Sequence, residues 1–402
     1  MVRISALHPY CPNNPSEFTT NPYDVIGKEE EKELKQNPNS LIHLILPDGE
    51  GDEVYNNALK AYKRFKASNI ITKEEKPSIF VYRQESPNFS QEGLILGISL
   101  HDYEENNIVK HEYTRVEPLK DRIMHITTTN VAAGLVWTVF RHDIKIKNVI
   151  EQIKQKKPKF DFNKYGYRHI VWQEDDLNTI STLSVLFKDK KVYIADGHHR
   201  AASAAEYRKI QIENAKEKEN SNSPWQFLLS YVASDDQIRI LPYNRVIRRL
   251  KDGKDDFLER LKEIYEITKV ETAFNPNRKN QVALCIRGQW YKLETKVKSF
   301  ESILDSLDVA ILQDKVLGPI LRIINIRTDD NIFFVGGLQD PKLMEEYTTE
   351  KGYDVFINLY PVDIEDLEAI ADSGRVMPPK STWFDPKLLS GLVLHDLSDE
   401  WE

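Results

Sequence analysis

The sequence predicts a mixed α/β fold. Short runs rich in β-branched and aromatic residues recur along the chain, and segments with helical spacing of apolar residues separate many of them. With 402 residues, 40% hydrophobic and 10% aromatic, the chain can bury a substantial core in two or three joined subdomains. Because strands and helices follow one another in an irregular order, a simple parallel, doubly wound sheet is disfavoured.

Strands are expected where β-branched and aromatic residues cluster between turn signals. They are Leu41–Leu46, Ser78–Arg83, Gly93–Leu100, Gly134–Arg141, Lys191–Ala195, Phe227–Ala233, Val282–Ile286 and Ile332–Gly336.

Helices are expected where apolar residues recur at helical spacing, and several of them begin at an Asp, a residue favoured as a cap. They are Asp52–Ala67, Asp143–Gln155, Asp175–Phe187, Ala201–Glu213, Asp255–Tyr265, Val309–Leu317, Pro341–Glu350 and Ile364–Ser373.

Composition excludes several classes of protein. A formal net charge of −8 disfavours a general nucleic-acid binder, although local basic clusters remain possible. The two cysteines, Cys11 and Cys285, form no C-x-x-C pattern, so neither a disulfide framework nor a zinc knuckle is expected. No apolar run is long enough for export or membrane insertion. We therefore expect a cytoplasmic protein without nucleic-acid or membrane partners.

The most informative stretch is the junction between the expected strand Lys191–Ala195 and the helix that follows it. Asp196 and Gly197 come at the end of the strand, and His198-His199-Arg200 lead into the helix. A helix N-terminus binds anions through its backbone N–H groups, and a glycine allows a ligand to approach closely. The two imidazoles and the guanidinium add donors suited to phosphate oxygens. Alternatively, the two histidines are surface residues with hydrogen-bond partners of their own and bind no ligand. The occurrence of all these residues together at a strand-to-helix junction favours a phosphate site.

Four other segments carry candidate site residues, each with a plausible structural role instead. Charged residues after Gly93–Leu100 supply a potential acid or base and two cations, or form a solvated hairpin end. A proline-centred turn near the N-terminus could cap backbone groups or touch a ligand. An arginine follows the strand Phe227–Ala233, and a proline-stiffened segment anchored by Trp383 and Phe384 carries a lysine and two hydroxyls. The residues are His111, Glu112, Lys120 and Arg122; Asn21, Tyr23 and Asp24; Arg245; and Lys380, Ser381 and Thr382.

Taken in order, these motifs resemble a family long catalogued only as a domain of unknown function, and the resemblance spans nearly the whole chain. Members of that family are associated with pyrophosphate-dependent phosphorylation of free L-serine to O-phospho-L-serine. The Asp-Gly-His-His-Arg element is similar to that of the ADP-dependent free serine kinases of the ParB/sulfiredoxin-like superfamily. The motifs are Asn21–Ile26, Val81–Gln84, His111-Glu112 with Lys120–Arg122, Ala195–Arg200 and Met377–Phe384.

The resemblance implies a ParB/sulfiredoxin-like phosphate-binding core elaborated by mixed sheets and flanking helices. It divides the chain into an N-terminal α/β subdomain over 1–145 with substrate-site loops, the core over 146–250, and a C-terminal α/β subdomain over 251–402. The loop that contains Lys380 is expected to return from the last of these to the site.

The resemblance also implies roles for the residues of a kinase site. Asp196 or Glu112 is the base for the serine hydroxyl, with His199 as a further catalytic group, and Asp196 holds Mg²⁺. The donor phosphates bind to Gly197, His198, His199 and Arg200. Further phosphate contacts come from His111, Lys120, Arg122, Lys380, Ser381 and Thr382. The serine substrate contacts Asn21, Tyr23, Asp24 and Arg245.

Several alternatives stay open. Because neither a P-loop nor the protein-kinase motif set is present, those mechanisms are disfavoured, but pyrophosphate, ADP and ATP all remain possible donors. A nucleotide-gated, ParB-like DNA-binding regulator would use Arg245–Lys251 as a basic patch, against the acidic total charge. A phosphohydrolase would hold a metal with Asp196 and the two histidines. The oligomeric state is open.

Overall fold

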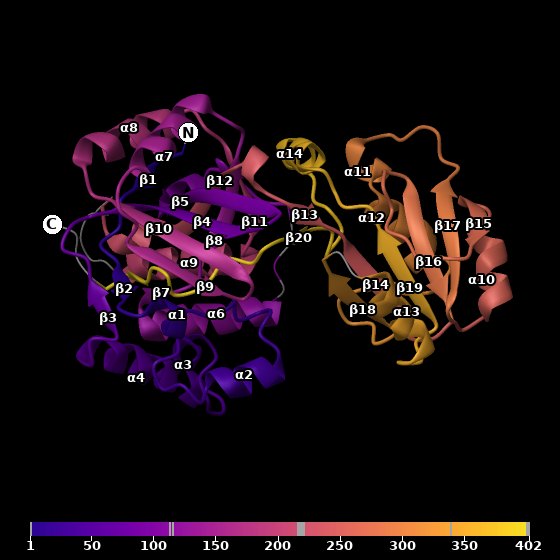
Figure 1. The fold of residues 1–402 in the computed structure, drawn as a ribbon, viewed down its shortest axis with the longest axis horizontal. Helices are drawn as coiled ribbons and strands as arrows, with labels where there is room; N and C mark the ends of the chain where they lie inside the picture. Colours follow the sequence, from indigo (N-terminus) through magenta and orange to yellow (C-terminus); the bar gives the residue numbers. More distant parts are fainter. Residues whose placement is uncertain (1, 112–113, 115, 215–221, 338–339, 399–402) are drawn as a thin grey trace. The chain divides into compact units, whose positions relative to one another are not determined.

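The computed structural model describes residues 2–111, 114, 116–214, 222–337 and 340–398. The chain forms two compact units: unit 1 combines Met1–Lys110, Thr114–Ile238 and Pro386–Glu402, and unit 2 combines His111–Tyr113 and Arg239–Asp385. Of the yellow C-terminal part in Figure 1, the residues from Pro386 onward thus belong to unit 1 and those before Pro386 to unit 2. Mixed helices and sheets confirm the predicted fold class. The division differs from the three predicted segments because strands from 1–145 and from 146–250 share one sheet.

Unit 1 is built on a nine-stranded sheet in the order β6-β11-β8-β12-β5-β4-β10-β9, with β1 paired to β5. The pairs β6–β11 and β8–β12 are parallel, whereas the hairpins β4–β5 and β9–β10 are antiparallel. The strands are β1 (Ile4–Ser5), β4 (Ile79–Ser86), β5 (Phe89–Ser99), β6 (Ile108–Val109), β8 (Val136–Phe140), β9 (Phe160–Lys164), β10 (Tyr167–Glu174), β11 (Val192–Asp196) and β12 (Phe227–Ser234). Two short pairs, β2 (Tyr10–Pro12) with β3 (Ile71–Lys73) and β7 (Val131–Ala132) with β21 (His395–Asp396), complete the unit.

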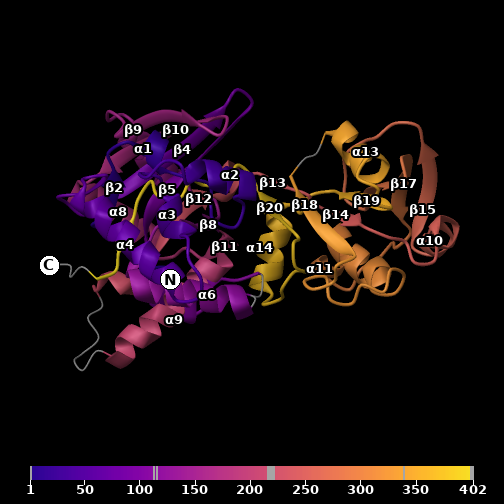
Figure 2. The same ribbon diagram turned by 90° about the horizontal axis from the view of Figure 1, so that it is seen from below.

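Helices surround this sheet, and their ends follow local capping chemistry. Asp143 accepts a hydrogen bond from the Lys145 N–H and so acts as the predicted cap. The next helix is capped by Asp176, one residue after the predicted Asp175, and Asp176 accepts a hydrogen bond from the Thr179 N–H. Helices α6 and α9 lie side by side (Figure 2). The helices are α1 (Pro15–Phe18), α2 (Lys28–Leu34), α3 (Ile42–Ile45), α4 (Glu53–Ala67), α5 (Leu100–Glu104), α6 (Val116–Thr129), α7 (Ile144–Ile153), α8 (Leu177–Phe187) and α9 (His198–Asn214). None of the helices in the described part of the chain is long and apolar enough to cross a membrane.

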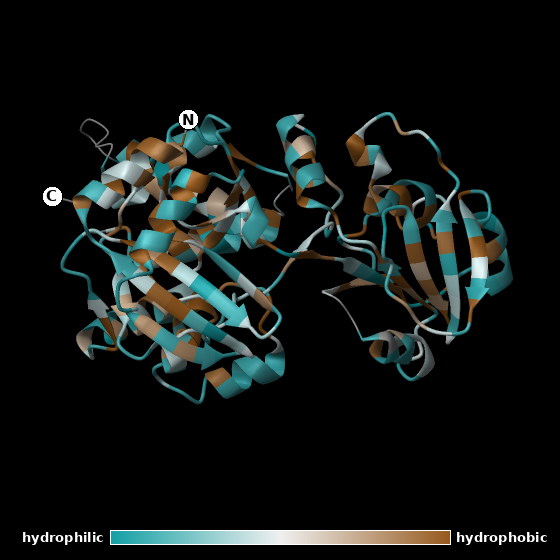
Figure 3. Ribbon diagram, turned by 45° about the horizontal axis from the view of Figure 1, so that its top comes forward, coloured by the Kyte–Doolittle hydropathy of each residue, from teal (hydrophilic) through white to brown (hydrophobic). Residues whose placement is uncertain are grey.

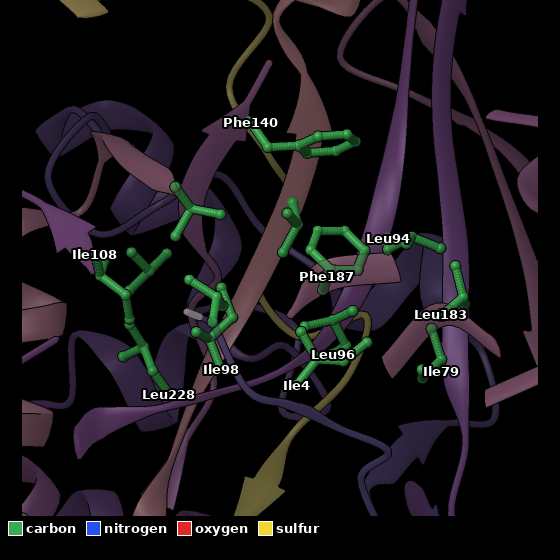
Figure 4. Close-up of a cluster of buried hydrophobic side chains, with 14 of the residues drawn as sticks. Ile4, Ile79, Leu94, Leu96, Ile98, Ile108, Phe140, Leu183, Phe187 and Leu228 are labelled. Atoms are coloured by element: carbon green, nitrogen blue, oxygen red, sulfur yellow. The ribbon is translucent and has the colours of Figure 1, made fainter. Parts of the chain in front are cut away.

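The main core of unit 1 lies on one face of its sheet (Figure 4). Leu94, Leu96 and Ile98 alternate along β5 on this face, and Leu183 and Phe187 reach it from α8. The rings of Phe140 and Phe187 pack edge to face, with their centres 5.2 Å apart. Each buried side chain of this size stabilises the fold by about 1.5–3 kcal/mol, so the cluster holds the sheet and its helices together.

Unit 2 contains a six-stranded sheet in the order β15-β17-β16-β19-β14-β18, in which all the recorded pairs are antiparallel. Its strands are β14 (Tyr243–Ile247), β15 (Tyr265–Val270), β16 (Gln281–Ile286), β17 (Gln289–Thr295), β18 (Ile332–Gly336) and β19 (Val355–Leu359), and β13 (Ile240–Leu241) pairs with β20 (Trp383–Phe384). Its helices are α10 (Lys254–Leu261), α11 (Ile303–Ser306), α12 (Asp308–Ile311) with a π-helical turn at Leu312–Leu317, α13 (Pro341–Thr349) and α14 (Ile364–Asp372). Hydrophobic residues recur along the strands of both sheets (Figure 3).

The predicted elements coincide with observed ones within a few residues, except at Leu41–Leu46. The strand predicted there is wrong: Ile42–Ile45 form helix α3, whose apolar side chains pack against Phe18, Tyr62 and Phe65. A short continuous apolar run fits a buried strand and a buried helical turn equally well, so periodicity could not separate them.

Candidate functional site

The junction between β11 and α9 has the predicted strand-to-helix geometry. Asp196 ends β11, Gly197 adopts φ +95°, and α9 begins at His198. The Ala201 N–H donates to the Gly197 carbonyl at 3.0 Å, which closes the first helical turn. The register of β11 against β8 shifts between Ile194 and Asp196, an irregularity that redirects the end of a strand. The backbone is thus shaped so that Asp196 and the first helical N–H groups lie at one place.

The Arg200 side chain folds back over this turn. Its guanidinium donates to the Leu135 carbonyl, and its Nη2 lies 3.5 Å from Oδ2 of Asp196. A Cβ at Gly197 would lie 3.1 Å from Cζ of Arg200, and a Cβ at Gly134 would lie 3.2 Å from its Cδ. Both glycines therefore leave the room that the Arg200 side chain occupies.

Asp196 is surrounded by positive charge. Nζ of Lys387 lies 3.6 Å from the same Oδ2 that faces Arg200. Burial raises the pKa of the Asp196 carboxyl, but the charges of Lys387, Arg200 and His198 outweigh it and hold the pKa at about 2. A carboxylate with so low a pKa is a weak base, since a general base works best with a pKa near the operating pH.

Lys387 was missed from the sequence. It lies in the same proline-rich segment as Lys380, but it belongs to unit 1, whereas Lys380 belongs to unit 2. The Gln84 amide donates to the Lys387 carbonyl at 3.0 Å, and the Gln91 amide donates to the Pro386 carbonyl at 3.3 Å. Both glutamines are buried, on β4 and β5. Gln84 and Gln91 were the available signal in the sequence: each is a polar residue on an otherwise apolar strand, and a buried amide needs a hydrogen-bond partner.

A small cavity of about 80 Å³, which opens to solvent, adjoins this turn within unit 1. Three of the predicted site residues, Tyr23, Arg122 and Arg200, line it. Apolar side chains form much of the remaining wall, namely Leu100, Ile126, Val136, Trp225, Phe227 and Leu228. A cavity with apolar walls and a few polar groups is typical of small-molecule sites.

Arg122 and Tyr23 form the polar edge of the cavity. The Arg122 guanidinium lies 4.3 Å from the centre of the Tyr23 ring and donates to Asp121 at 2.8 and 2.5 Å. Burial is the main reason that the pKa of Tyr23 is raised, and the charges of Arg200 and Arg122 partly oppose it. The buried His125 beside them has its pKa lowered to about 4, first by burial and then by the Arg122 charge, so it is neutral at pH 7.

Other predicted residues of unit 1 are not brought to the cavity. The Lys120 side chain is 66% exposed and pairs with Glu117 at 3.2 Å, so it points to solvent. The Asn21 amide donates to Glu30 at 3.0 Å, and Asp24 is exposed. The turn that contains them thus contributes Tyr23 to the cavity wall, while Asn21 stabilises the local structure.

The predicted residues that belong to unit 2 include His111, Arg245, Lys380, Ser381 and Thr382. Arg245, predicted to bind substrate, is 1% exposed there, and its guanidinium donates to the carbonyls of Tyr243 and Lys380. Burial lowers its pKa to about 9. Inside this unit Arg245 therefore supports the turn at Lys380 instead of facing a ligand.

That turn is strained and internally bonded. Lys380 has φ +60°, and its Nζ lies 5.0 Å from the centre of the Tyr243 ring. The Ser381 hydroxyl donates to the Pro378 carbonyl at 2.6 Å, and Thr382 is half-buried. The buried His111 accepts a hydrogen bond at its carbonyl from the Met377 N–H at 3.2 Å. Glu112 lies outside the described residues.

The described residues contain no group of three or more His, Cys, Asp or Glu side chains that could hold a metal ion. Asp196 and the two histidines therefore do not form the metal site of the phosphohydrolase alternative. Mg²⁺ is commonly held by one or two carboxylates together with substrate phosphates and water. The ionised Asp196 carboxylate fits a Mg²⁺ site of this kind, in which the protein supplies one carboxylate and the substrate supplies phosphate oxygens.

Comparison with known proteins gave a family match and distant structural similarities. The model of the family described as "Protein of unknown function (DUF1015)" matches residues 5–310. No curated protein matches. A free serine kinase variant in complex with ADP is 15% identical, covering 74% of this chain and 92% of that chain with a TM-score of 0.38.

Two further structures are similar at the same level. A conserved hypothetical protein from Pyrococcus furiosus is 16% identical, over 74% of this chain and 95% of its own, with a TM-score of 0.36. SbnI from Staphylococcus aureus, with a C-terminal truncation, is 11% identical, over 74% and 85%, with a TM-score of 0.36. The family model covers most of the chain and agrees with the motifs that run from its N-terminus to Arg200: the protein belongs to the DUF1015 family.

Proposed function

We propose that the protein is a small-molecule kinase that transfers a phosphoryl group from pyrophosphate to the hydroxyl of free L-serine, giving O-phospho-L-serine and phosphate. The single observation that carries the proposal is the β11–α9 junction, where Arg200 and Lys387 approach one carboxylate oxygen beside a helix N-terminus. Cations and helical N–H groups at one point favour a phosphate with several negative charges.

The transfer needs positioning and charge stabilisation more than covalent chemistry. The serine oxygen attacks the phosphorus of the donor, and a base accepts the proton of the hydroxyl. The bond from that phosphorus to the bridging oxygen breaks, and the departing phosphate takes the electron pair. The two candidate bases are Asp196 and Glu112, and a pKa of about 2 counts against Asp196.

Mg²⁺ is part of the proposal. When bound, it would neutralise the charge of the donor phosphates, with Asp196 as its protein ligand. Gly197, His198, His199 and Arg200 would contact the same phosphates from the start of α9. We expect removal of Mg²⁺ by a chelator to abolish turnover while the protein stays folded.

ADP or ATP is the second candidate donor. The cavity beside Arg200 favours it, because the apolar side chains of Val136, Trp225 and Phe227 could accept a planar base while the guanidinium faces phosphate. Pyrophosphate needs no such wall. The apolar wall of the cavity is thus a feature that a nucleotide donor would use and pyrophosphate would not.

The test is to incubate the full chain with Mg²⁺, L-serine and one donor at a time, and to measure O-phospho-L-serine by mass spectrometry. We expect product with pyrophosphate, and product with ADP or ATP alone would select the alternative. A parallel reaction without L-serine measures hydrolysis of the donor. If no donor gives phosphoserine, the kinase proposal is overturned.

A further inference from the structure

We infer that Lys387 is a catalytic residue of the phosphoryl transfer proposed above, contacting the donor phosphates, and that Asp196 positions it. The inference rests on the proposed function, and it names a group that lies far from the Asp196–Arg200 motif along the chain. Three features of unit 1 support it: the way in which the Lys387 backbone is held, the charge around Asp196, and the chemistry of an ammonium group.

Two buried glutamines hold the backbone of Lys387 in place. Gln84 and Gln91 are 1% and 0% exposed, and their amides donate to the carbonyls of Lys387 and Pro386. Gln91 also donates to the Gln84 side-chain oxygen at 2.7 Å, so the two amides form one network. Buried amides destabilise a core unless they are hydrogen-bonded, so both side chains are committed to this segment. The position of Lys387 is therefore determined by the sheet itself.

The ion pairs of Asp196 bring two cations to one carboxylate oxygen. Nζ of Lys387 and Nη2 of Arg200 lie 3.6 and 3.5 Å from the same oxygen, Oδ2 of Asp196. Both cations are 14% exposed, and the aspartate is 26% exposed. Lys387 and Arg200 thus bring two positive charges to one oxygen of Asp196, in a place only partly open to water. A phosphate bound beside that oxygen would interact with both cations.

The two cations differ in how they can serve a phosphate. The Arg200 guanidinium is held on two sides, by a hydrogen bond to the Leu135 carbonyl and by an ion pair with Asp196. Lys387 ends in an ammonium with three donors on a flexible stem, so it can keep Asp196 and also bond a phosphate oxygen. As the bond to the departing phosphate breaks, negative charge grows on that phosphate. The ammonium of Lys387 stabilises this charge while it stays protonated, and Asp196 stays ionised and orients it.

The first experiment measures phosphate binding without turnover. Isothermal titration with pyrophosphate and Mg²⁺, and separately with ADP and Mg²⁺, compares the wild-type protein with Lys387→Met, Lys387→Arg and Lys76→Met. Lys76 is a matched control, because it also pairs with an aspartate, Asp175, at 3.1 Å, but is 67% exposed. We expect Lys387→Met to weaken donor binding about ten- to hundredfold, the scale of one hydrogen bond to a charged group. Lys387→Arg should recover part of the affinity, and Lys76→Met should bind as the wild type does.

The second experiment measures phosphoserine formation by the same variants. We expect Lys387→Met to lower kcat as well as affinity, because the charge of the departing phosphate develops during the transfer. Unchanged donor binding and turnover in Lys387→Met would overturn the role of Lys387 and leave the kinase intact. Donor binding that depends on Lys387, without phosphoserine from any donor, would overturn the kinase and retain the phosphate contact. A wild-type protein that binds neither compound would overturn both.

Folding of the variants is checked by circular dichroism and thermal melting. If Lys387→Met does not fold, Lys387→Gln carries the same comparison, since its amide can still donate to Asp196. The positioning role of Asp196 is tested by the double-mutant cycle of Lys387→Met and Asp196→Asn. We expect their effects on donor affinity to be strongly non-additive, whereas additive effects would contradict the assignment.

Discussion

Gly197 and Arg200 are packed against each other so closely that a Cβ on the glycine would lie 3.1 Å from Cζ and Nε of the arginine. The glycine also has φ +95°, which residues with a side chain rarely adopt. The turn that ends β11 and the course of the Arg200 side chain are therefore linked. A change in one residue displaces the other.

This link predicts the outcome of Gly197→Ala. The variant should lose about 1–3 kcal/mol of stability from backbone strain, and its methyl group should push the guanidinium away from Asp196. Donor binding, measured by calorimetry, should fall at least tenfold. Gly166→Ala is the matched control, because Gly166 has φ +79° and nothing within 4 Å of an added Cβ. Equal donor affinity in the two variants would show that packing against Arg200 does not matter.

Replacing Arg200 or His199 by Ala should lower turnover strongly with the fold intact. For Arg200→Ala we expect a loss of kcat of about a hundredfold, the scale of losing one donor to a developing charge. Arg200→Lys should recover only part of it, because an ammonium cannot bond the Leu135 carbonyl and Asp196 as the guanidinium fork does. Steady-state kinetics measure both effects. Wild-type turnover in both alanine variants would remove the phosphate assignment of this turn.

The base is identified by Glu112→Gln and Asp196→Asn compared in one assay. Glu112→Gln should reduce kcat by about a hundredfold or more with donor affinity retained, because it removes the proton acceptor. Asp196→Asn should mainly weaken binding of donor and Mg²⁺, because we expect the Asp196 carboxylate to bind cations and not to accept the proton of the serine hydroxyl. The reverse pattern would return the base to Asp196.

Unit 2 contains a buried acid whose titration predicts a pH-dependent stability. Asp308 is 6% exposed, and although it accepts a hydrogen bond from the Asn280 N–H at 3.0 Å, burial raises its pKa from 3.8 to about 7. Between these values the folded protein binds a proton that the unfolded chain does not, so stability is highest below about pH 4 for this group and falls as the pH rises to about 7. The loss is at most about 4 kcal/mol.

Asp308→Asn should remove most of this dependence, because an amide keeps the acceptor for Asn280 and carries no charge. Urea unfolding at pH 5 and pH 8 should give the variant a smaller difference than the wild type. Asp314→Asn, at an exposed position on the same helical segment, makes the same change in charge and should leave the difference unaltered. A wild-type protein equally stable at both pH values would contradict the raised pKa.

Local patterns were enough to predict much of the fold. The strand that ends at Asp196 and the cap residue Asp143 were predicted because the spacing of apolar residues and the capping groups act within a few residues. The cap of α8 was predicted at Asp175 and lies one residue later, at Asp176. The strand predicted at Leu41–Leu46 was wrong, because the residues packed around this segment, and not its own pattern, decide between a strand and helix α3. Helix α6, which carries Arg122 into the cavity, was not predicted because its charged residues resembled a solvated loop.

By itself the sequence determined the mixed α/β class and the glycine turn before α9, because local spacing and turn residues decide them. It also determined the family to which the chain belongs, because the order of short motifs along the chain is read without the fold. The tertiary structure alone decided that Lys387 faces Asp196 and that Tyr23, Arg122 and Arg200 line one cavity. It also decided that Lys120 points to solvent and that Arg245 is buried. Charge and hydrogen-bonding groups are visible in a sequence, but the carboxylate or carbonyl that each one meets depends on how the sheet brings distant segments together.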